Sequence, residues 1–242
     1  DAIFLGAMGL PDVRTREGTE ISPQLDIRDA FELFAGVRPI RTMPGLPSVL
    51  TAPESAHIDM VLVREQTEGL FYGRGKTEFR DNAAFDTMAI SEQGTRRLTE
   101  FAMALARQRG PRPGADKPRI TLIDKANVLE TSRLWRRVVM AIAKSYPEVA
   151  LECLYIDKAT TQMVLNPSHF DVILTDNLFG DILNDQASVL LGSTGILPSA
   201  SIGSDTAMFE PVHGSYPQAT GKNIANPVAS ILSVALLLQH FG

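Results

Sequence analysis

The fold is decided by residues 119–156, which read RITLIDKANVLETSRLWRRVVMAIAKSYPEVALECLYI. An apolar strand is predicted at 119–123 and a second one at 150–156, because each is a short run rich in Ile, Leu and Val. Between them, Trp135, Val138 and Ile142 recur at helical spacing and predict a helix over 132–145. A helix that connects two strands favours a parallel pair, and therefore an α/β architecture.

The same alternation of strand and helix extends along the rest of the chain. Strands are predicted at 2–5, 58–63, 119–123, 150–156, 170–175 and 207–209. Helices are predicted at 25–34, 92–108, 132–145, 160–165, 179–191 and 227–241. Ser91 is a predicted N-cap of the second helix, and Asn226-Pro227 places an N-cap before a proline at the start of the last.

Composition excludes several classes of protein. The 242 residues are 44% hydrophobic and 21% charged, which is typical of a folded globular chain and not of a disordered one. The sequence lacks both an apolar run of about 20 residues and a basic N-terminal region, so neither a membrane span nor a signal peptide is expected. A single cysteine, Cys153, excludes an internal disulfide framework and is consistent with a cytoplasmic location.

Charge is distributed unevenly around a net value of −5. Residues 159–221 contain no Lys or Arg, which argues against a nucleic-acid partner because phosphate binding needs clustered positive charge. Asp181 and Asp185 lie in this acidic segment at a spacing of i and i+4, on one face of a predicted helix. Two interpretations stay open: solvated acids, or ligands for Mg²⁺ or Mn²⁺, which prefer oxygen donors.

Other side chains indicate an acidic substrate. Arg28, Arg38 and Arg64 could converge on a carboxylate, since guanidinium groups bind carboxylates in a bidentate manner, although surface ion pairs are the alternative for each one. Lys125 follows a strand and could act as a general base if its pKa is lowered. Gly214 and His213 could approach a nucleotide, while the glycine motifs of Rossmann and P-loop proteins are both missing from the sequence.

Taken in order, the motifs resemble those of the β-decarboxylating dehydrogenases, the family of isopropylmalate, isocitrate, homoisocitrate and tartrate dehydrogenases. The resemblance covers almost the whole chain. It rests on seven stretches: LFAGVRP (33–39), VREQTEG (63–69), IDKANVLE (123–130), YID (155–157), NLFGDILND (177–185), GSTGILPSAS (192–201) and EPVHGS (210–215).

The resemblance implies a role for each matching residue. The three arginines would hold the substrate carboxylate that leaves as CO₂, and Lys125 of a partner subunit would act on the substrate hydroxyl. Asp181 and Asp185, with Asp157 from the partner, would bind Mg²⁺ or Mn²⁺. Asn177 would contact substrate, and the residues implied in cofactor binding are Asn127, Glu210, His213, Gly214, Ser215 and Asn226.

Three departures from the family pattern affect these assignments. Phe71 occupies the position of the family tyrosine that protonates carbon, so Tyr72 is the predicted proton donor or another group replaces it. Gln218 stands in place of the aspartate of NAD-dependent members; since the surrounding segment lacks basic residues, NAD is predicted rather than NADP. The residues expected around the substituent that differs between the family's substrates are of both types. Ser22 matches isocitrate dehydrogenases, Leu25 matches isopropylmalate dehydrogenases, and Gln24 replaces a second leucine of the latter.

The expected molecule is a homodimer with shared active sites and an isopropylmalate dehydrogenase-like two-domain α/β fold. Residues 1–33 and 192–242 are predicted to form a cofactor domain with a mostly parallel sheet, and residues 34–191 a central dimerisation domain. The family's first glycine-rich turn and last helices are missing from the printed sequence, which implies part of a longer protein.

The predicted activity is metal- and NAD-dependent oxidative decarboxylation of a 2-hydroxy diacid, 3-isopropylmalate first. Tartrate, malate, isocitrate or homoisocitrate as substrate, and a non-catalytic regulatory homologue, are the alternatives.

Overall fold

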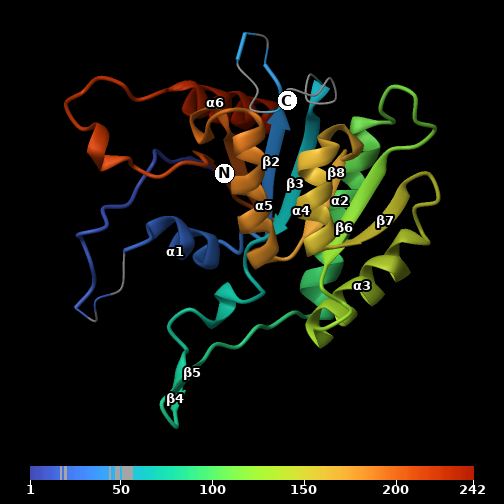
Figure 1. Ribbon diagram of the computed structural model, residues 1–242, viewed down its shortest axis with the longest axis horizontal. Helices are drawn as coiled ribbons and strands as arrows, with labels where there is room; N and C mark the ends of the chain where they lie inside the picture. Colours follow the sequence, from blue (N-terminus) through green and yellow to red (C-terminus); the bar gives the residue numbers. More distant parts are fainter. Residues whose placement is uncertain (17, 19–20, 44, 47–49, 51–56) are drawn as a thin grey trace.

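A computed structural model describes residues 1–16, 18, 21–43, 45–46, 50 and 57–242 (Figure 1). Its strands are β1 (Ala2–Phe4), β2 (Ala35–Arg41), β3 (Asp59–Glu65), β4 (Glu78–Arg80), β5 (Ala83–Phe85), β6 (Arg119–Asp124), β7 (Ala150–Tyr155), β8 (Val172–Thr175), β9 (Pro198–Ile202) and β10 (Ala207–Pro211). Its α-helices are α1 (Pro23–Ala30), α2 (Glu92–Arg109), α3 (Glu130–Ala143), α4 (Ile156–Leu165), α5 (Asn177–Leu190) and α6 (Val228–Phe241).

Among the described residues, eight strands form one sheet in the order β1-β10-β9-β2-β3-β8-β6-β7. The half formed by β3, β8, β6 and β7 is parallel throughout, as the strand–helix–strand pattern predicts. Strand β2 is antiparallel to both β3 and β9, and β10 is antiparallel to β9 but parallel to β1. A second, two-stranded sheet of β4 and β5 projects away from the body (Figure 1).

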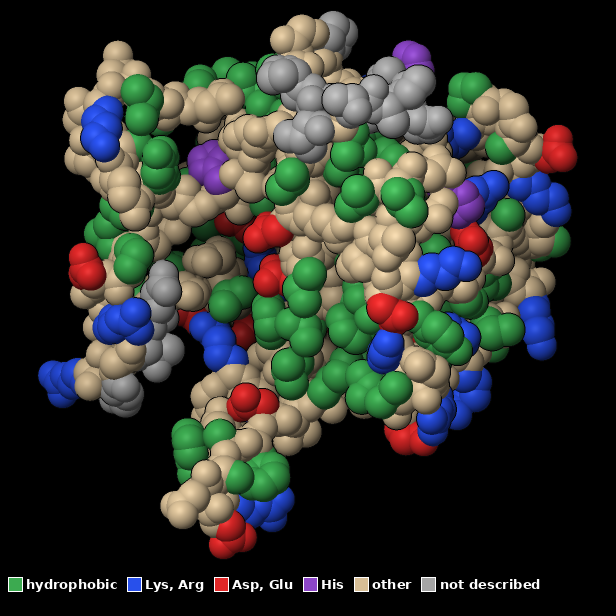
Figure 2. Space-filling model, in the orientation of Figure 1, with side chains coloured by type: hydrophobic (Ala, Val, Ile, Leu, Met, Phe, Trp, Pro, Cys, Tyr) green, Lys and Arg blue, Asp and Glu red, His purple; other side chains and the backbone are tan. Residues whose placement is uncertain are grey.

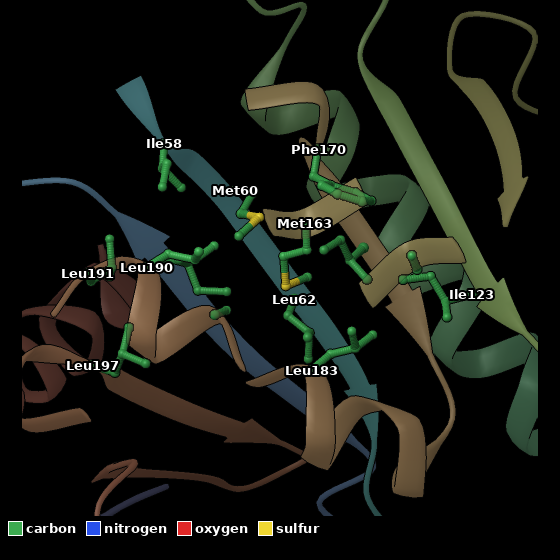
Figure 3. Packing of buried hydrophobic residues seen from close by; sticks show 14 of the residues in the cluster. Ile58, Met60, Leu62, Ile123, Met163, Phe170, Leu183, Leu190, Leu191 and Leu197 are labelled. Carbon is green, nitrogen blue, oxygen red and sulfur yellow. The ribbon is translucent and has the colours of Figure 1, made fainter. Parts of the chain in front are cut away.

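Helices cover both faces of the sheet because β3 is apolar on both sides. Met60 and Leu62 point toward α4 and α5, where they pack with Met163 and Leu183 (Figure 3). Val61, in the alternate position, packs on the opposite face with the buried side chains of α2 and α3, including Leu98, Met103, Trp135 and Val139. The alternation of side chains along a strand explains why one short segment contributes to two cores.

The structure confirms strands and helices at all the predicted places, with shifted ends. The first helix ends at Ala30 and not at residue 34, because the chain turns at Glu32, which has a φ of 48°, before β2 begins. The Ser91 cap is confirmed, since its hydroxyl accepts a hydrogen bond from the Gly94 N–H at 2.9 Å. The last helix begins at Val228 with Pro227 as its N-cap, so the cap predicted at Asn226 is wrong by one residue, although the Asn226 side chain accepts a hydrogen bond from the Val228 N–H at 3.0 Å.

Strands β2 and β9 were missed by the sequence pattern, as was the β4–β5 hairpin. Strand β2 contains Gly36 and Pro39, which are uncommon within strands, and the charged Arg38 and Arg41 interrupt its apolar pattern. Pro39 has no backbone N–H to donate to a neighbouring strand. It is tolerated because β9 pairs only with Ala35–Val37 and needs no hydrogen bond from residue 39.

The β9–β2 pairing makes one sheet of strands from both predicted domains. Strands β1, β9 and β10 come from the predicted cofactor domain, and the other five from the predicted central domain. The division of the chain at residues 33 and 191 stays a prediction. Within the described part of the chain, no helix is both long and apolar enough to cross a membrane.

The two-sided core gives a first prediction. Met103→Ala removes a fully buried side chain from the face covered by α2 and should lower the free energy of unfolding by about 2–5 kcal/mol. Met140→Ala makes the same change on α3 at a side chain that is 50% exposed and should alter it by less than about 0.5 kcal/mol. Urea denaturation measures both, and equal losses for the two variants would contradict the packing described here.

Candidate active site

Three arginines from three elements meet in one cavity of about 360 Å³. Arg64 lies near the end of β3, Arg38 on the neighbouring β2, and Arg28 on α1. The same cavity is lined by Asp181 and Asp185 of α5 and by Glu210 of β10. On the face drawn in Figure 2, acidic and basic side chains lie together in a hollow beside the main body.

The three guanidinium groups are buried, with residue exposures of 8% for Arg28, 3% for Arg38 and 5% for Arg64. Burial lowers the pKa of Arg38, and the positive charges of Arg28 and Arg64 lower it further, against the opposing effect of Glu210. Burial lowers the pKa of Arg64 too, while Asp181 acts in the opposite direction. Three like charges held away from water favour the binding of an anion between them.

Two of the arginines pair with carboxylates inside the cavity. Arg28 donates to Glu210 at 2.7 Å, and Arg64 forms an ion pair with Asp181. Arg38 instead donates to the backbone carbonyl of Ala200 at 3.0 Å. The three arginines and the two aspartates of α5, which the sequence assigns to one site, therefore line the same cavity.

Several buried polar atoms on this cavity have no hydrogen-bond partner. Among the described residues, eight buried side-chain atoms lack a partner, and five of them belong to cavity residues: Gln24 Oε1, Arg28 Nε, Asn184 Oδ1, Ser199 Oγ and His213 Nε2. Buried polar groups are normally satisfied, so this concentration is typical of a site that receives a polar ligand. Asn184 and Ser199 were missed from the sequence, although Asn184 lies one helical turn after Asp181.

The start of α5 fixes the orientation of Arg64. Asn177 accepts from Arg64 Nε at 3.0 Å and from Nη2 at 2.7 Å, and donates to the Glu68 carbonyl at 2.9 Å. Gly180 leaves room for the arginine, because a Cβ there would lie 2.8 Å from Arg64 Cγ. Asn177, predicted to contact substrate, binds Arg64 instead; it does not line this cavity but a small pocket beside it.

A second cavity of about 540 Å³ adjoins the first through His213 and Gly214, which line both. Ser215 and Asn226, two more of the predicted cofactor residues, also line it, whereas Gln218 does not. None of the described residues lining this cavity is Lys or Arg. Glu210, predicted to bind cofactor, lies instead in the first cavity beside Arg28.

Lys125, Asp157 and Asn127 lie outside both cavities. Lys125 follows β6 and forms an ion pair with Asp157 in the first turn of α4; this contact lowers the pKa of Asp157. Asn127 lies two residues after Lys125, and its backbone carbonyl accepts a hydrogen bond from Arg133 at 3.4 Å. One chain therefore holds the predicted base and the third predicted metal ligand at a place separate from its own arginines.

The predicted proton donor is not brought to the first cavity either. Phe71 lines it, at the start of the short 3₁₀ helix η2 (Phe71–Gly73), and its ring lies 5.5 Å from Arg64 Cζ. Tyr72 is half exposed, and Lys76 Nζ lies 3.7 Å from the centre of its ring. Of the residues predicted for the variable substrate group, Gln24 and Leu25 line the cavity and Ser22 does not.

Glu65, next to Arg64, is a buried acid whose ion pair with Arg97 is long, at 3.7 Å. Its carboxylate accepts from the Thr67 N–H at 2.7 Å and from the Thr67 hydroxyl at 2.9 Å. Burial raises the pKa of Glu65 to about 7, against the lowering effect of these hydrogen bonds. The folded chain therefore binds more protons at this group than the unfolded chain does between pH 5 and 7.

This gives a second prediction. As pH rises from 5 to 8, the wild-type chain should lose stability relative to Glu65→Gln, because only the wild type must ionise a buried carboxyl group. The measurement is the difference in unfolding free energy between the two proteins at each pH. A difference that is independent of pH, or that moves in favour of the wild type, would contradict the assignment.

Comparison with known proteins agrees with this arrangement. Residues 1–242 match the family model described as isocitrate/isopropylmalate dehydrogenase. The chain is 43% identical to a 3-isopropylmalate dehydrogenase of Desulfitobacterium hafniense, over all of this chain and 68% of that protein, and 43% identical to one of Thermotoga maritima over the same shares. It spans about two thirds of the length of these relatives.

Solved structures agree in fold. The structure of an isocitrate dehydrogenase from Methylococcus capsulatus superposes with a TM-score of 0.87 at 35% identity, covering 100% of this chain and 68% of that one. The family match extends over every segment that contributes to the arginine cavity. The chain therefore belongs to the isocitrate/isopropylmalate dehydrogenase family.

Proposed function

We propose that the protein catalyses the oxidative decarboxylation of a 2-hydroxy diacid, 3-isopropylmalate first, with NAD and Mg²⁺ or Mn²⁺. The observation that carries this proposal is the cavity in which three buried arginines face two aspartates. Its relatives named 3-isopropylmalate dehydrogenase support the choice of acid. Buried guanidinium groups suit the carboxylate that leaves as CO₂, because they bind it in a fixed orientation away from water.

The donors on α5 fit a hard divalent cation. Asp181 and Asp185 offer carboxylate oxygens to the same cavity, and the unpartnered Oδ1 of Asn184 lies between them in sequence. Among the described residues, no group of three His, Cys, Asp or Glu side chains is close enough to hold a metal ion. The pair on α5 is therefore incomplete within one chain, and Asp157 of a second copy is the proposed third ligand.

The same placement supports a homodimer with shared sites. Lys125 and Asp157 lie together outside the arginine cavity, so a second copy is the proposed source of both groups. Their mutual ion pair keeps them in one cluster that a neighbouring chain could present as a unit. This arrangement explains why neither residue faces the arginines of its own chain.

The proposed chemistry distributes the work among these residues. Bound metal would supply Lewis-acid polarisation of the hydroxyl and the later enolate oxygen, and bound NAD would supply the hydride acceptor. Lys125 of the second copy takes the hydroxyl proton as the 2-hydroxy carbon loses its hydride. The carboxylate held by the arginines then leaves as CO₂, and a proton returns to carbon. Tyr72 is still the predicted donor of that proton. Since Phe71 lines the cavity and Tyr72 does not, η2 would have to rearrange for the Tyr72 hydroxyl to reach the substrate.

NAD is the proposed cofactor because no described residue that lines the second cavity is Lys or Arg. It adjoins the acid cavity through His213 and Gly214, so a dinucleotide bound there would reach the substrate. The lining of this cavity, as far as the structure describes it, offers no Lys or Arg to a 2′-phosphate.

The direct test is NADH formation by the natural protein with 3-isopropylmalate, isocitrate, tartrate and malate, each with Mg²⁺ or Mn²⁺. We expect turnover of 3-isopropylmalate that EDTA abolishes. Asp181→Asn should lower kcat/KM by at least about 100-fold, because it removes a charged ligand from the cation. Asp205→Asn, the same change on an exposed loop, should leave activity unchanged. Turnover of none of the acids would overturn the proposal.

Mixing two inactive variants tests the shared site separately. Lys125→Ala and Asp181→Asn affect residues that are proposed to meet only across the dimer. After subunits exchange at random, about one quarter of the sites should combine a native Lys125 with a native Asp181, so about a quarter of wild-type activity should return. If activity stays at the level of the separate variants, each site uses the lysine and aspartates of a single chain.

A further inference from the structure

Arg38 differs from the other two arginines of the cavity in its surroundings. Arg28 and Arg64 each pair with a carboxylate, whereas no described acidic side chain lies within ion-pair distance of Arg38. Its Nη1 group donates to the backbone carbonyls of Ala200 at 3.0 Å and of Val37 at 3.2 Å. The other terminal nitrogen of Arg38, Nη2, therefore needs a different hydrogen-bond acceptor.

Gln66 provides that acceptor. It is 6% exposed, directly follows β3, and is anchored by a bond from its backbone N–H to the Phe34 carbonyl at 3.0 Å. In the amide orientation that satisfies both of its ends, Oε1 accepts from Arg38 Nη2 at 3.0 Å. In that orientation, Nε2 donates to the Ser201 hydroxyl at 2.9 Å and to the Leu33 carbonyl at 3.3 Å.

Gly36 makes the space in which this amide lies. It is opposite Arg64 in the β2–β3 pairing and opposite Ser201 in the β2–β9 pairing. A Cβ at position 36 would lie 2.6 Å from the terminal amide atom that is Oε1 in this orientation and 2.7 Å from Cδ, so any larger residue would displace the amide. The glycine, the glutamine and the arginine therefore form one packed unit across three strands.

We propose that Gln66 is a positioning residue for the acid site: lodged against Gly36, its amide holds the Arg38 guanidinium toward the substrate carboxylate. The proposal rests on the proposed function of this cavity as an acid site. Gln66 does not line the arginine cavity but a small pocket beside it, with Arg28 and Phe71, so its proposed effect on the substrate is through Arg38.

A neutral amide suits this role better than a carboxylate would. A glutamate at position 66 would orient Arg38 equally well but would also neutralise it, and the substrate carboxylate would then compete with a permanent ion pair. The amide orients the guanidinium and leaves its charge available.

The test compares Gln66→Leu, Gln66→Glu and Gly36→Ala with a control, Gln108→Leu, which makes the same change on an exposed position of α2. Calorimetry of the natural protein measures the Kd of 3-isopropylmalate and, separately, of NAD. Gln66→Leu and Gly36→Ala should each weaken acid binding about tenfold, the typical effect of one lost hydrogen bond to a charged group. NAD binding should change by less than about twofold, and the control should match the wild type.

A second readout does not depend on the identity of the acid. Nitrogen-15 NMR of arginine side chains reports rotation of each guanidinium group, with the Arg38 signal assigned by its loss in Arg38→Lys. The wild type should show a restrained Arg38, Gln66→Leu and Gly36→Ala a freely rotating one, and Gln66→Glu a restrained one. Gln66→Glu should nevertheless bind the acid more weakly than the wild type, because the new charge competes with it.

The outcomes separate this proposal from the one on which it rests. If the wild type does not bind 3-isopropylmalate but Arg38 loses its restraint in Gln66→Leu, the assigned acid is wrong and the positioning role stands. If Arg38 rotates equally in the wild type and in Gln66→Leu, or if the Kd of the acid is unchanged, the positioning role is overturned. A lower unfolding temperature with unchanged acid binding would show a structural role only.

Discussion

The structure depends on a burial that is unfavourable in isolation: three positively charged guanidinium groups lie together, largely shielded from water, at the middle of a sheet. Such a cluster persists only if every group has partners that offset the loss of hydration. Glu210, Asp181 and the Ala200 carbonyl are those partners, and they come from β10, α5 and β9. Strand β2 lies between β3 and β9 and pairs with both, so the order of the central strands is inseparable from the chemistry of the cavity.

Much of this arrangement could be predicted from the sequence, for reasons that differ between segments. The parallel half of the sheet has strands that are apolar on both sides, and their hydrophobic runs are easy to identify. Strands β2 and β9 contain Arg, Pro, Gly and Ser, of which Arg38 and Ser199 line the site, and those residues hide the strand pattern. Asp181 and Asp185 could be paired from helical spacing alone, whereas Ser199 and Gln66 have meaning only once three strands are side by side.

The placement of Lys125 and Asn177 illustrates a second limit. Motif resemblance assigns a residue to a site without saying from which chain or from which side it acts. Asn177 lies in the right region but faces Arg64, so its amide holds the arginine in place. Lys125 lies at the end of the expected strand, yet it faces Asp157 on the surface of its own chain. In both cases the sequence predicts the neighbourhood, and only the three-dimensional arrangement gives the direction.

The ion pair between Arg64 and Asp181 has a consequence for the order of events during binding. The two groups neutralise each other now, but in the proposed site each has a different task, one toward an incoming anion and the other toward a cation. An anion that takes over the guanidinium releases the aspartate, and a cation that takes over the aspartate releases the guanidinium. Either ligand breaks the ion pair when it binds, so the other ligand no longer has to break it. The anion and the cation should therefore bind synergistically, each raising the affinity for the other.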